Sequence, residues 1–82
     1  MTNEFSVCQF FEDDTYEYVC RFVHPKTAVD TFIRYINSVG ARLGTTKRVI
    51  IIDGSDCTNA EWVFGKGIVF GLNFSNRIGR TE

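Results

Sequence analysis

The chain has 82 residues, of which 44% are hydrophobic and 23% are charged, a composition typical of one small globular domain spanning residues 1–82. Its formal net charge of −1 gives no overall electrostatic attraction to nucleic acid, which we therefore do not expect as a partner. No stretch approaches the roughly 18 consecutive apolar residues of a membrane span, so we expect no membrane association.

The cysteines predict a reducing environment. They are Cys8, Cys20 and Cys57, an odd number at irregular spacing, which does not resemble a disulfide framework. Residues 1–4 lack the basic start and the apolar core of a secretory signal. We therefore expect free thiols in a cytoplasmic protein.

Residues 4–23 consist of two runs of β-favouring residues on either side of a polar cluster at residues 12–15. This pattern predicts an antiparallel β-hairpin. No Asn-Gly or Asp-Gly pair is present to define the turn, so the sequence leaves the register of the hairpin open.

Two registers of this hairpin have different consequences. A two-residue turn at residues 13–14 places three apolar side chains on one face of the sheet: Phe10, Val19 and Val23. A three-residue loop instead places Cys8 opposite Cys20, where a cross-strand disulfide is geometrically allowed. Neither register gives the hairpin a clean polar face, so we expect both of its faces to be covered.

Residues 25–43 carry apolar side chains at helical spacing, which predicts one amphipathic helix. Pro25 suits the first helical position, with His24 as the N-cap, and Gly44 suits the left-handed position after the helix. Gly40 lies within the apolar stripe, which predicts close approach of a strand at this point. The stripe expected to face the core comprises Ala28, Val29, Phe32, Ile33, Ile36, Val39, Gly40 and Leu43.

The second half of the chain contains two further strands. The β-branched run at residues 48–52 predicts a strand covered on both faces. Residues 53–59 have loop composition, and residues 61–64 form the next predicted strand. Residues 68–70 extend that strand or form a fifth one, and residues 71–82 are expected to be a loosely packed tail.

These elements predict an α+β fold in the order β-β-α-β-β. We expect a mainly antiparallel sheet of four strands, or five if residues 68–70 are separate, with one helix at about residues 25–43 packed on one face. This packing leaves the second sheet face bare, although several of its residues are apolar. Exposed apolar surface of this kind generally marks an interaction site.

The loop at residues 53–59 is the richest in polar side chains. Asp53, Asp56 and Asn59 are the candidate ligand-binding residues, because their oxygens could hold a small polar molecule. The spacing superficially resembles a calcium loop, but Thr58 occupies the place of the obligatory glycine and Phe64 that of the bidentate glutamate. We therefore predict no metal site here.

No catalytic residue or cofactor is predicted. His24 and Cys57 would form a nucleophile pair only if their side chains came within hydrogen-bond reach, which the sequence does not show. Gly65, Gly67 and Gly71 do not lie between a strand and the start of a helix, so they do not indicate a dinucleotide-binding loop. An enzyme is therefore the third of three interpretations.

The preferred interpretation is a non-enzymatic protein-binding or adaptor module that forms a homodimer through the sheet face or an edge strand. The predicted interface residues are Phe10, Val19 and Val23. The alternative is a small-ligand-binding domain with a pocket between helix and sheet near residues 53–59. A filled core would favour the protein partner, and a closed cavity would favour the ligand.

Overall fold

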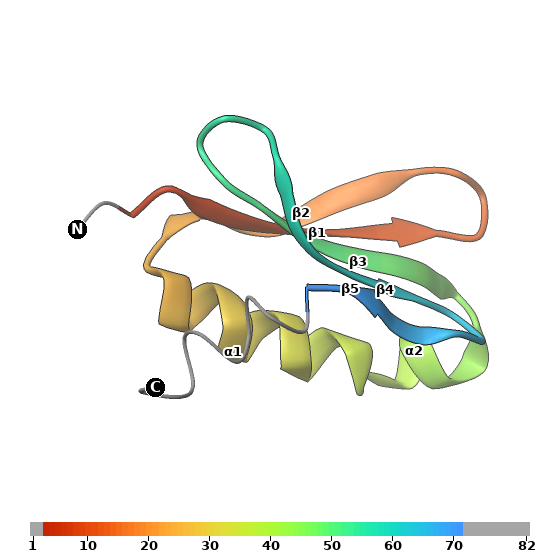
Figure 1. The fold of residues 1–82 in the computed structure, drawn as a ribbon. Coiled ribbons are helices and arrows are strands. Elements are labelled where there is room, and N and C mark those ends of the chain that lie inside the picture. Colours follow the sequence, from red (N-terminus) through yellow and green to blue (C-terminus); the bar gives the residue numbers. More distant parts are fainter. Residues whose placement is uncertain (1–2, 72–82) are drawn as a thin grey trace, which may run out of the picture.

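The computed structural model describes residues 3–71 of the chain, in the arrangement shown in Figure 1. Its strands are β1 (Phe5–Phe11), β2 (Tyr16–Val23), β3 (Thr46–Ile52), β4 (Thr58–Val63) and β5 (Gly67–Phe70), and its helices are α1 (Pro25–Ile36) and α2 (Val39–Leu43). The strands form one antiparallel sheet in the order β2-β1-β3-β4-β5, and both helices lie on one side of it. The predicted α+β fold is thus confirmed, with a fifth strand.

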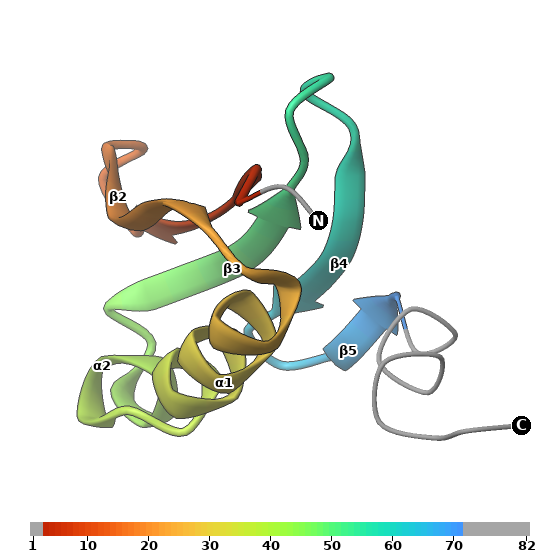
Figure 2. The same ribbon diagram turned by 90° about the vertical axis from the view of Figure 1, so that its left-hand side faces the viewer.

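Figure 2 shows β2 and β5 at opposite edges of the sheet, with α1 beneath its middle. Neither helix of the described part of the chain is long and apolar enough to cross a membrane. The tail predicted at residues 71–82 lies outside the described residues from residue 72 onward.

The β1–β2 turn differs from both turns that the sequence suggested. It occupies residues 12–15, and the backbone N–H of Phe11 donates to the carbonyl of Thr15 at 2.8 Å. Asp14 adopts a left-handed backbone with φ 71°, which aspartate tolerates better than most residues. Phe11 therefore faces Thr15 across the turn, and Phe10 lies opposite Tyr16.

Two irregularities in β2 then shift the register. Cys8 lies opposite Tyr18 but Val7 lies opposite Cys20, so Val19 is an extra residue on β2. The predicted alternative of Cys8 facing Cys20 is therefore not realised, and every cysteine of the chain is a free thiol. The pairing of Phe10 with Tyr16 also separates Phe10 from Val19 and Val23. Tyr16 and Tyr18 share the face of Phe10, and Val19 follows Tyr18 on the opposite face, where Val23 also packs.

The helix predicted at residues 25–43 is interrupted and becomes α1 and α2. Ser38 causes the break, because its Oγ accepts a hydrogen bond from the Ala41 N–H at 3.1 Å and starts a new helix. The interruption changes the phase of the apolar stripe. Val39 and Leu43, which follow the break, were expected in the core and are exposed instead. Ile33 was also expected in the core and is exposed, although it lies in α1, before the break.

The ends of the helical region follow the prediction. The Lys26 N–H donates to His24 Nδ1 at 3.1 Å, so His24 is the N-cap of α1 and Pro25 occupies its first turn. Gly44 takes φ 93° after α2 and its N–H donates to the Gly40 carbonyl.

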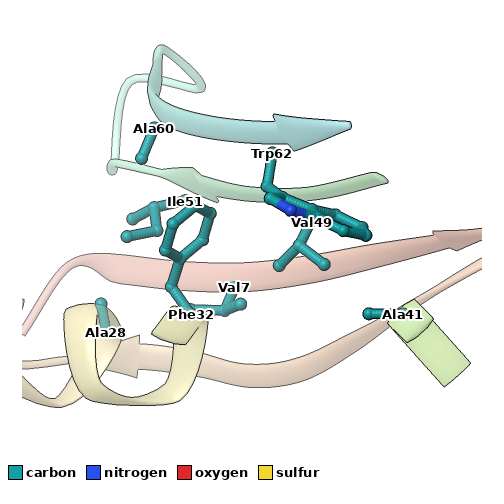
Figure 3. Packing of buried hydrophobic residues seen from close by; sticks show 8 residues of the cluster. All are labelled: Val7, Ala28, Phe32, Ala41, Val49, Ile51, Ala60 and Trp62. Atoms are coloured by element: carbon teal, nitrogen blue, oxygen red, sulfur yellow. The ribbon is translucent and has the colours of Figure 1, made fainter. Parts of the chain in front are cut away.

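The core lies between α1 and the sheet (Figure 3). Phe32 projects from α1 toward Ile51 and Trp62, and all three side chains are buried. Alternation along β3 directs Val49 and Ile51 toward α1 and Ile50 toward the opposite face, where it is also buried. The complete cluster comprises Val7, Ala28, Phe32, Ala41, Val49, Ile51, Ala60 and Trp62.

Gly40 permits the predicted close approach of a strand. A Cβ atom at Gly40 would lie 2.8 Å from Oγ1 of Thr46 in β3. That hydroxyl is buried and donates to Gln9 Oε1 at 3.0 Å, while Gln9 Nε2 donates to Glu17 at 2.8 Å. The oxygen therefore has little freedom to move away from an added side chain.

The Gly40→Ala variant tests this contact. Alanine favours a helix interior by about 1 kcal/mol over glycine, but we expect a net loss of roughly 1–2 kcal/mol because the new methyl overlaps Thr46 Oγ1. Urea unfolding measures the change. In a Thr46→Ala background the same substitution should cost less, and an equal cost in both backgrounds would contradict the assignment.

Candidate functional site

The sheet face opposite α1 carries no second layer within residues 3–71 (Figure 1). Cys8 and Ile50 face each other across β1 and β3 on this open face, and both are buried. Burial without a covering helix or strand means that neighbouring side chains on the same face shield them. These neighbours are large and define a continuous surface.

We call this surface the aromatic–arginine cluster; it comprises Phe10, Tyr16, Tyr18, Arg21, Phe22 and Arg48. The ring centres of Phe10 and Tyr16 are 5.5 Å apart, and those of Tyr16 and Tyr18 are 6.2 Å apart with the rings near perpendicular. Both separations fall in the range of favourable aromatic pairs. Three rings from β1 and β2 thus form one connected row.

Two arginines extend this row at its ends. The guanidinium carbon of Arg21 lies 4.5 Å from the ring centre of Tyr18 and 5.0 Å from that of Phe22. Arg48 lies 4.8 Å from the ring centre of Phe10. Each contact of this kind contributes roughly 0.5–1 kcal/mol at an exposed site. The cluster is therefore ordered by its own contacts before any partner binds.

The electrostatic environments of the two arginines differ. Arg48 Nε donates to Glu61 at 2.5 Å, which neutralises its charge. Within residues 3–71, Arg21 has no carboxylate partner; the ion pairs there are that one and Lys26–Asp30. The N–H groups of Arg21 therefore stay available for a carboxylate that another molecule supplies.

The aromatic side chains of β2 are unusually exposed. Tyr16, Tyr18 and Phe22 are 59%, 41% and 62% exposed, respectively. Isolated exposed hydrophobic residues are ordinary, but a contiguous patch of them marks an interaction surface. Tyrosine and arginine together are also the residue types that most often dominate the binding energy of protein interfaces.

Phe22 combines this exposure with an unfavourable backbone. Its φ is 56°, in the left-handed region, where a bulky residue costs on the order of 1–3 kcal/mol. The Phe22 N–H donates to Oγ of the buried Ser6 at 3.2 Å, which stabilises this conformation. The surrounding structure thus holds an exposed ring in a fixed position.

The predicted interface residues separate in the structure. Phe10 belongs to the aromatic–arginine cluster, whereas Val19 and Val23 pack against the core beneath the sheet. The sequence analysis did not select the tyrosines or Phe22, because the turn and the irregularities of β2 decide which face each side chain of this strand reaches. The alternation Tyr16-Glu17-Tyr18 was the sequence signal that could have identified the tyrosines.

The candidate ligand residues Asp53 and Asn59 do come together. Asp53 Oδ1 accepts hydrogen bonds from the N–H groups of Ser55 at 2.8 Å and Cys57 at 3.1 Å, and Oδ2 accepts from Asn59 Nδ2 at 3.1 Å. These bonds, that from Asn59 foremost, lower the pKa of Asp53 below its ordinary value of 3.8. The carboxylate oxygens thus organise the loop itself.

The remaining candidates are engaged locally. Asp56 is exposed in a left-handed conformation with φ 62°, and its N–H donates to the Asp53 carbonyl. His24 caps α1, and Cys57 Sγ lies 3.8 Å from the Ser55 carbonyl. Residues 3–71 contain no group of three or more His, Cys, Asp or Glu side chains arranged to hold a metal ion.

Among the thiols, Cys8 lies directly beneath the cluster. Burial raises its pKa above the ordinary thiol value of 9.0, more strongly than the nearby Arg48 charge lowers it. The protonated thiol is a poor nucleophile. Cys8 therefore acts here as a small apolar residue that supports the rings above it.

Comparison of the chain with protein-family models, curated proteins and solved structures gave no match. The functional proposal below consequently starts from the geometry of the open sheet face.

The Asp53→Asn variant tests the role of the 53–59 loop. At pH 7 we expect unfolding to be easier by about 1 kcal/mol, because one accepting oxygen becomes an amide donor facing Asn59, a loss moderated by solvent. A lowered folded-state pKa stabilises the fold above pH 3.8, and this contribution disappears as pH falls through the folded-state pKa. The difference between variant and wild type should therefore shrink toward pH 3.

Chemical denaturation at several pH values measures this effect. Asp56→Asn removes the same charge from the same loop without touching these three hydrogen bonds. We expect it to stay within about 0.5 kcal/mol of wild type at pH 7. Equal losses for the two variants would show that Asp53 has no special structural role.

Proposed function

We propose that this protein is a non-enzymatic protein-binding module that forms a homodimer through the aromatic–arginine cluster. The observation that carries the proposal is a row of exposed aromatic rings and arginines on a sheet face that no second layer of residues 3–71 covers. Rigid aromatic anchors lose little conformational entropy on binding, so they suit this role.

The charges around the cluster favour a protein over a nucleic acid. Glu12, Asp13 and Asp14 are exposed in the turn that leads into Tyr16, and they would repel phosphate groups. Arg48 is already paired with Glu61. Stacking of bases on aromatic rings usually takes place in a positively charged groove, which this face does not provide.

The same charges favour a second copy of this chain as the partner. The unpaired Arg21 lies near one end of β2, and the exposed carboxylates of Glu12 and Asp14 lie at the other end. A two-fold contact with antiparallel β2 strands brings each positive end to a negative end.

The face is a better candidate than the edge of the sheet. β2 is an edge strand, but the bulge at Val19 and the left-handed backbone of Phe22 interrupt its regular hydrogen-bonding edge. Such irregularities generally discourage pairing with another strand. Neither feature prevents another sheet from stacking on the side chains above it.

The small-ligand alternative has less support. Phe32, Ile51 and Trp62 fill the space between α1 and the sheet, where the ligand would lie (Figure 3). Oxygens of Asp53, the first of the proposed ligand residues, are already bonded within the loop. A filled core beside an open apolar face is the arrangement that favours a protein partner.

We also infer a reducing, cytoplasmic setting for this dimer. The supporting observation is that Cys8 and Cys20, on neighbouring strands, and the exposed Cys57 are all free thiols. Proteins of oxidising compartments more often use such cysteines in disulfides.

Sedimentation equilibrium tests the proposal. We expect the wild-type protein to dimerise between about 1 and 100 µM, and Tyr18→Ser to weaken dimerisation at least about tenfold, or about 1.4 kcal/mol. Leu43→Ser is the matched control, because Leu43 is 76% exposed on α2, on the opposite side of the sheet. It should leave dimerisation unchanged.

Two results would contradict the proposal. One is a wild-type protein that remains monomeric over the whole concentration range. The other is an equal loss of dimerisation in the Tyr18 and Leu43 variants, which would place the interface elsewhere. Circular dichroism of each variant checks that the fold is retained.

A further inference from the structure

We infer that Phe22 and Arg21 together form the anchor of the dimer, and that this anchor receives the acidic β1–β2 turn of a second copy of the chain. The inference rests on the proposed dimerisation and names the residues that direct it. It follows from four features of the structure: backbone strain, a hydrogen bond to the buried Ser6, an unpaired guanidinium and unpaired carboxylates.

Phe22 lies at an irregularity of β2, but its residue type is poorly suited to the left-handed backbone found there. Glycine or asparagine would adopt a φ of 56° at lower cost than phenylalanine. The ring is 62% exposed, so it adds little to the core in return. Unfavourable conformations that persist are concentrated at functional sites, where they position a side chain.

A hydrogen bond to Ser6 in the neighbouring strand also fixes the position of the Phe22 ring. The Ser6 hydroxyl oxygen is buried in β1 and accepts the Phe22 N–H. Cross-strand pairing resumes with Phe5 opposite Val23, so Phe22 belongs to an irregular segment that the regular ladder does not determine. A side chain held in place before binding loses less entropy when the partner arrives.

Arg21 completes the anchor. Its guanidinium carbon lies within 5.0 Å of the Tyr18 and Phe22 ring centres. The rings restrict the guanidinium, while no carboxylate of residues 3–71 forms an ion pair with it. Exclusion of water by these rings in a complex would strengthen an ion pair formed there.

The β1–β2 turn supplies the matching groups. Glu12 and Asp14 are exposed, and no carboxylate bond of theirs occurs within residues 3–71, whereas Asp13 accepts from the Thr15 N–H and hydroxyl. The Asp14 N–H donates to the Phe11 carbonyl, which fixes the turn.

The geometry of β2 sets the position of the two-fold axis. Seven residue steps separate Asp14 from Arg21, at most about 23 Å along an extended strand. An axis above the middle of this span passes near Tyr18. It brings the anchor of each copy to the turn of the other, so the dimer contains two identical contacts.

The first experiment separates binding from stability. Phe22→Gly removes both the ring and the strain, and Phe22→Asn removes the ring while tolerating the same backbone. We expect both variants to keep at least the wild-type urea midpoint, measured at a concentration where wild type is monomeric, and to dimerise at least about tenfold more weakly. A lower midpoint with unchanged dimerisation would show that Phe22 is structural.

The second experiment exchanges the charges. Arg21→Glu alone and Glu12→Lys/Asp14→Lys alone each place like charges at both contacts, so each variant should self-associate at least about tenfold more weakly. An equimolar mixture restores opposite charges at both contacts of a heterodimer. Sedimentation with one variant labelled at its N-terminus should show that the mixture associates as tightly as wild type.

These results distinguish the inference from the proposal on which it rests. A wild-type protein that stays monomeric overturns both. A wild-type dimer that Tyr18→Ser weakens, combined with a charge-exchanged mixture that does not associate, leaves the open face as the interface and overturns the acidic turn as its partner. If the charge-exchanged mixture associates and Phe22→Gly dimerises as tightly as wild type, the contact depends on Arg21 and Phe22 is not part of the anchor.

Discussion

The pairing of β1 with β2 determines which side chains of these strands enter the core of this small domain and which lie on its open sheet face. Val7 faces Cys20 on the core side, while one residue further along β1 Cys8 faces Tyr18 on the open side. The extra residue Val19 between these pairs makes this possible, because its bulge allows two apolar side chains of β2 to reach the core. Without it, strict alternation would turn Cys20 to the open side and Arg21 to the core side.

The open face depends on this register more strongly than the core does. Phe32, Val49 and Ile51 would meet in any sheet with α1 across it, since their alternation and helical spacing are local properties. The row from Phe10 to Tyr18 forms only if Phe10 lies opposite Tyr16. The β1–β2 turn secures that pairing through the local hydrogen bonds of Phe11 with Thr15 and Asp14.

Local signals explain why the fold was largely predictable. Pro25 and Gly44 mark the ends of the helical region, and the β-branched run of β3 defines the central strand. The break at Ser38 was missed because the apolar periodicity continues across it, whereas the capping hydrogen bond that stops the helix is a single contact. Ser38 followed by Ala41 carries no strong signature of a new helix.

The candidate site was less predictable, because it depends on contacts between residues distant in sequence. Phe10 lies in the aromatic–arginine cluster, but Val19 could not be assigned to the core without knowing that Phe10 pairs with Tyr16. The left-handed backbone of Phe22 could not be predicted either, because phenylalanine rarely adopts this conformation. The composition of the 53–59 loop indicated a cluster of oxygen atoms. In the structure, the Asp53 carboxylate accepts hydrogen bonds from neighbouring N–H groups of the same loop.

The small size of the domain links its stability to the open sheet face. A chain of this length buries only about 60–65% of its unfolded surface, and 15% of its residues are aromatic. Phe32 and Trp62 are buried, whereas Tyr16, Tyr18 and Phe22 are exposed. A second copy on the open face would add their area to the buried surface, and by mass action the fold would become more stable as concentration rises. In that case the strain at Phe22 is a cost that the monomer bears and the dimer offsets.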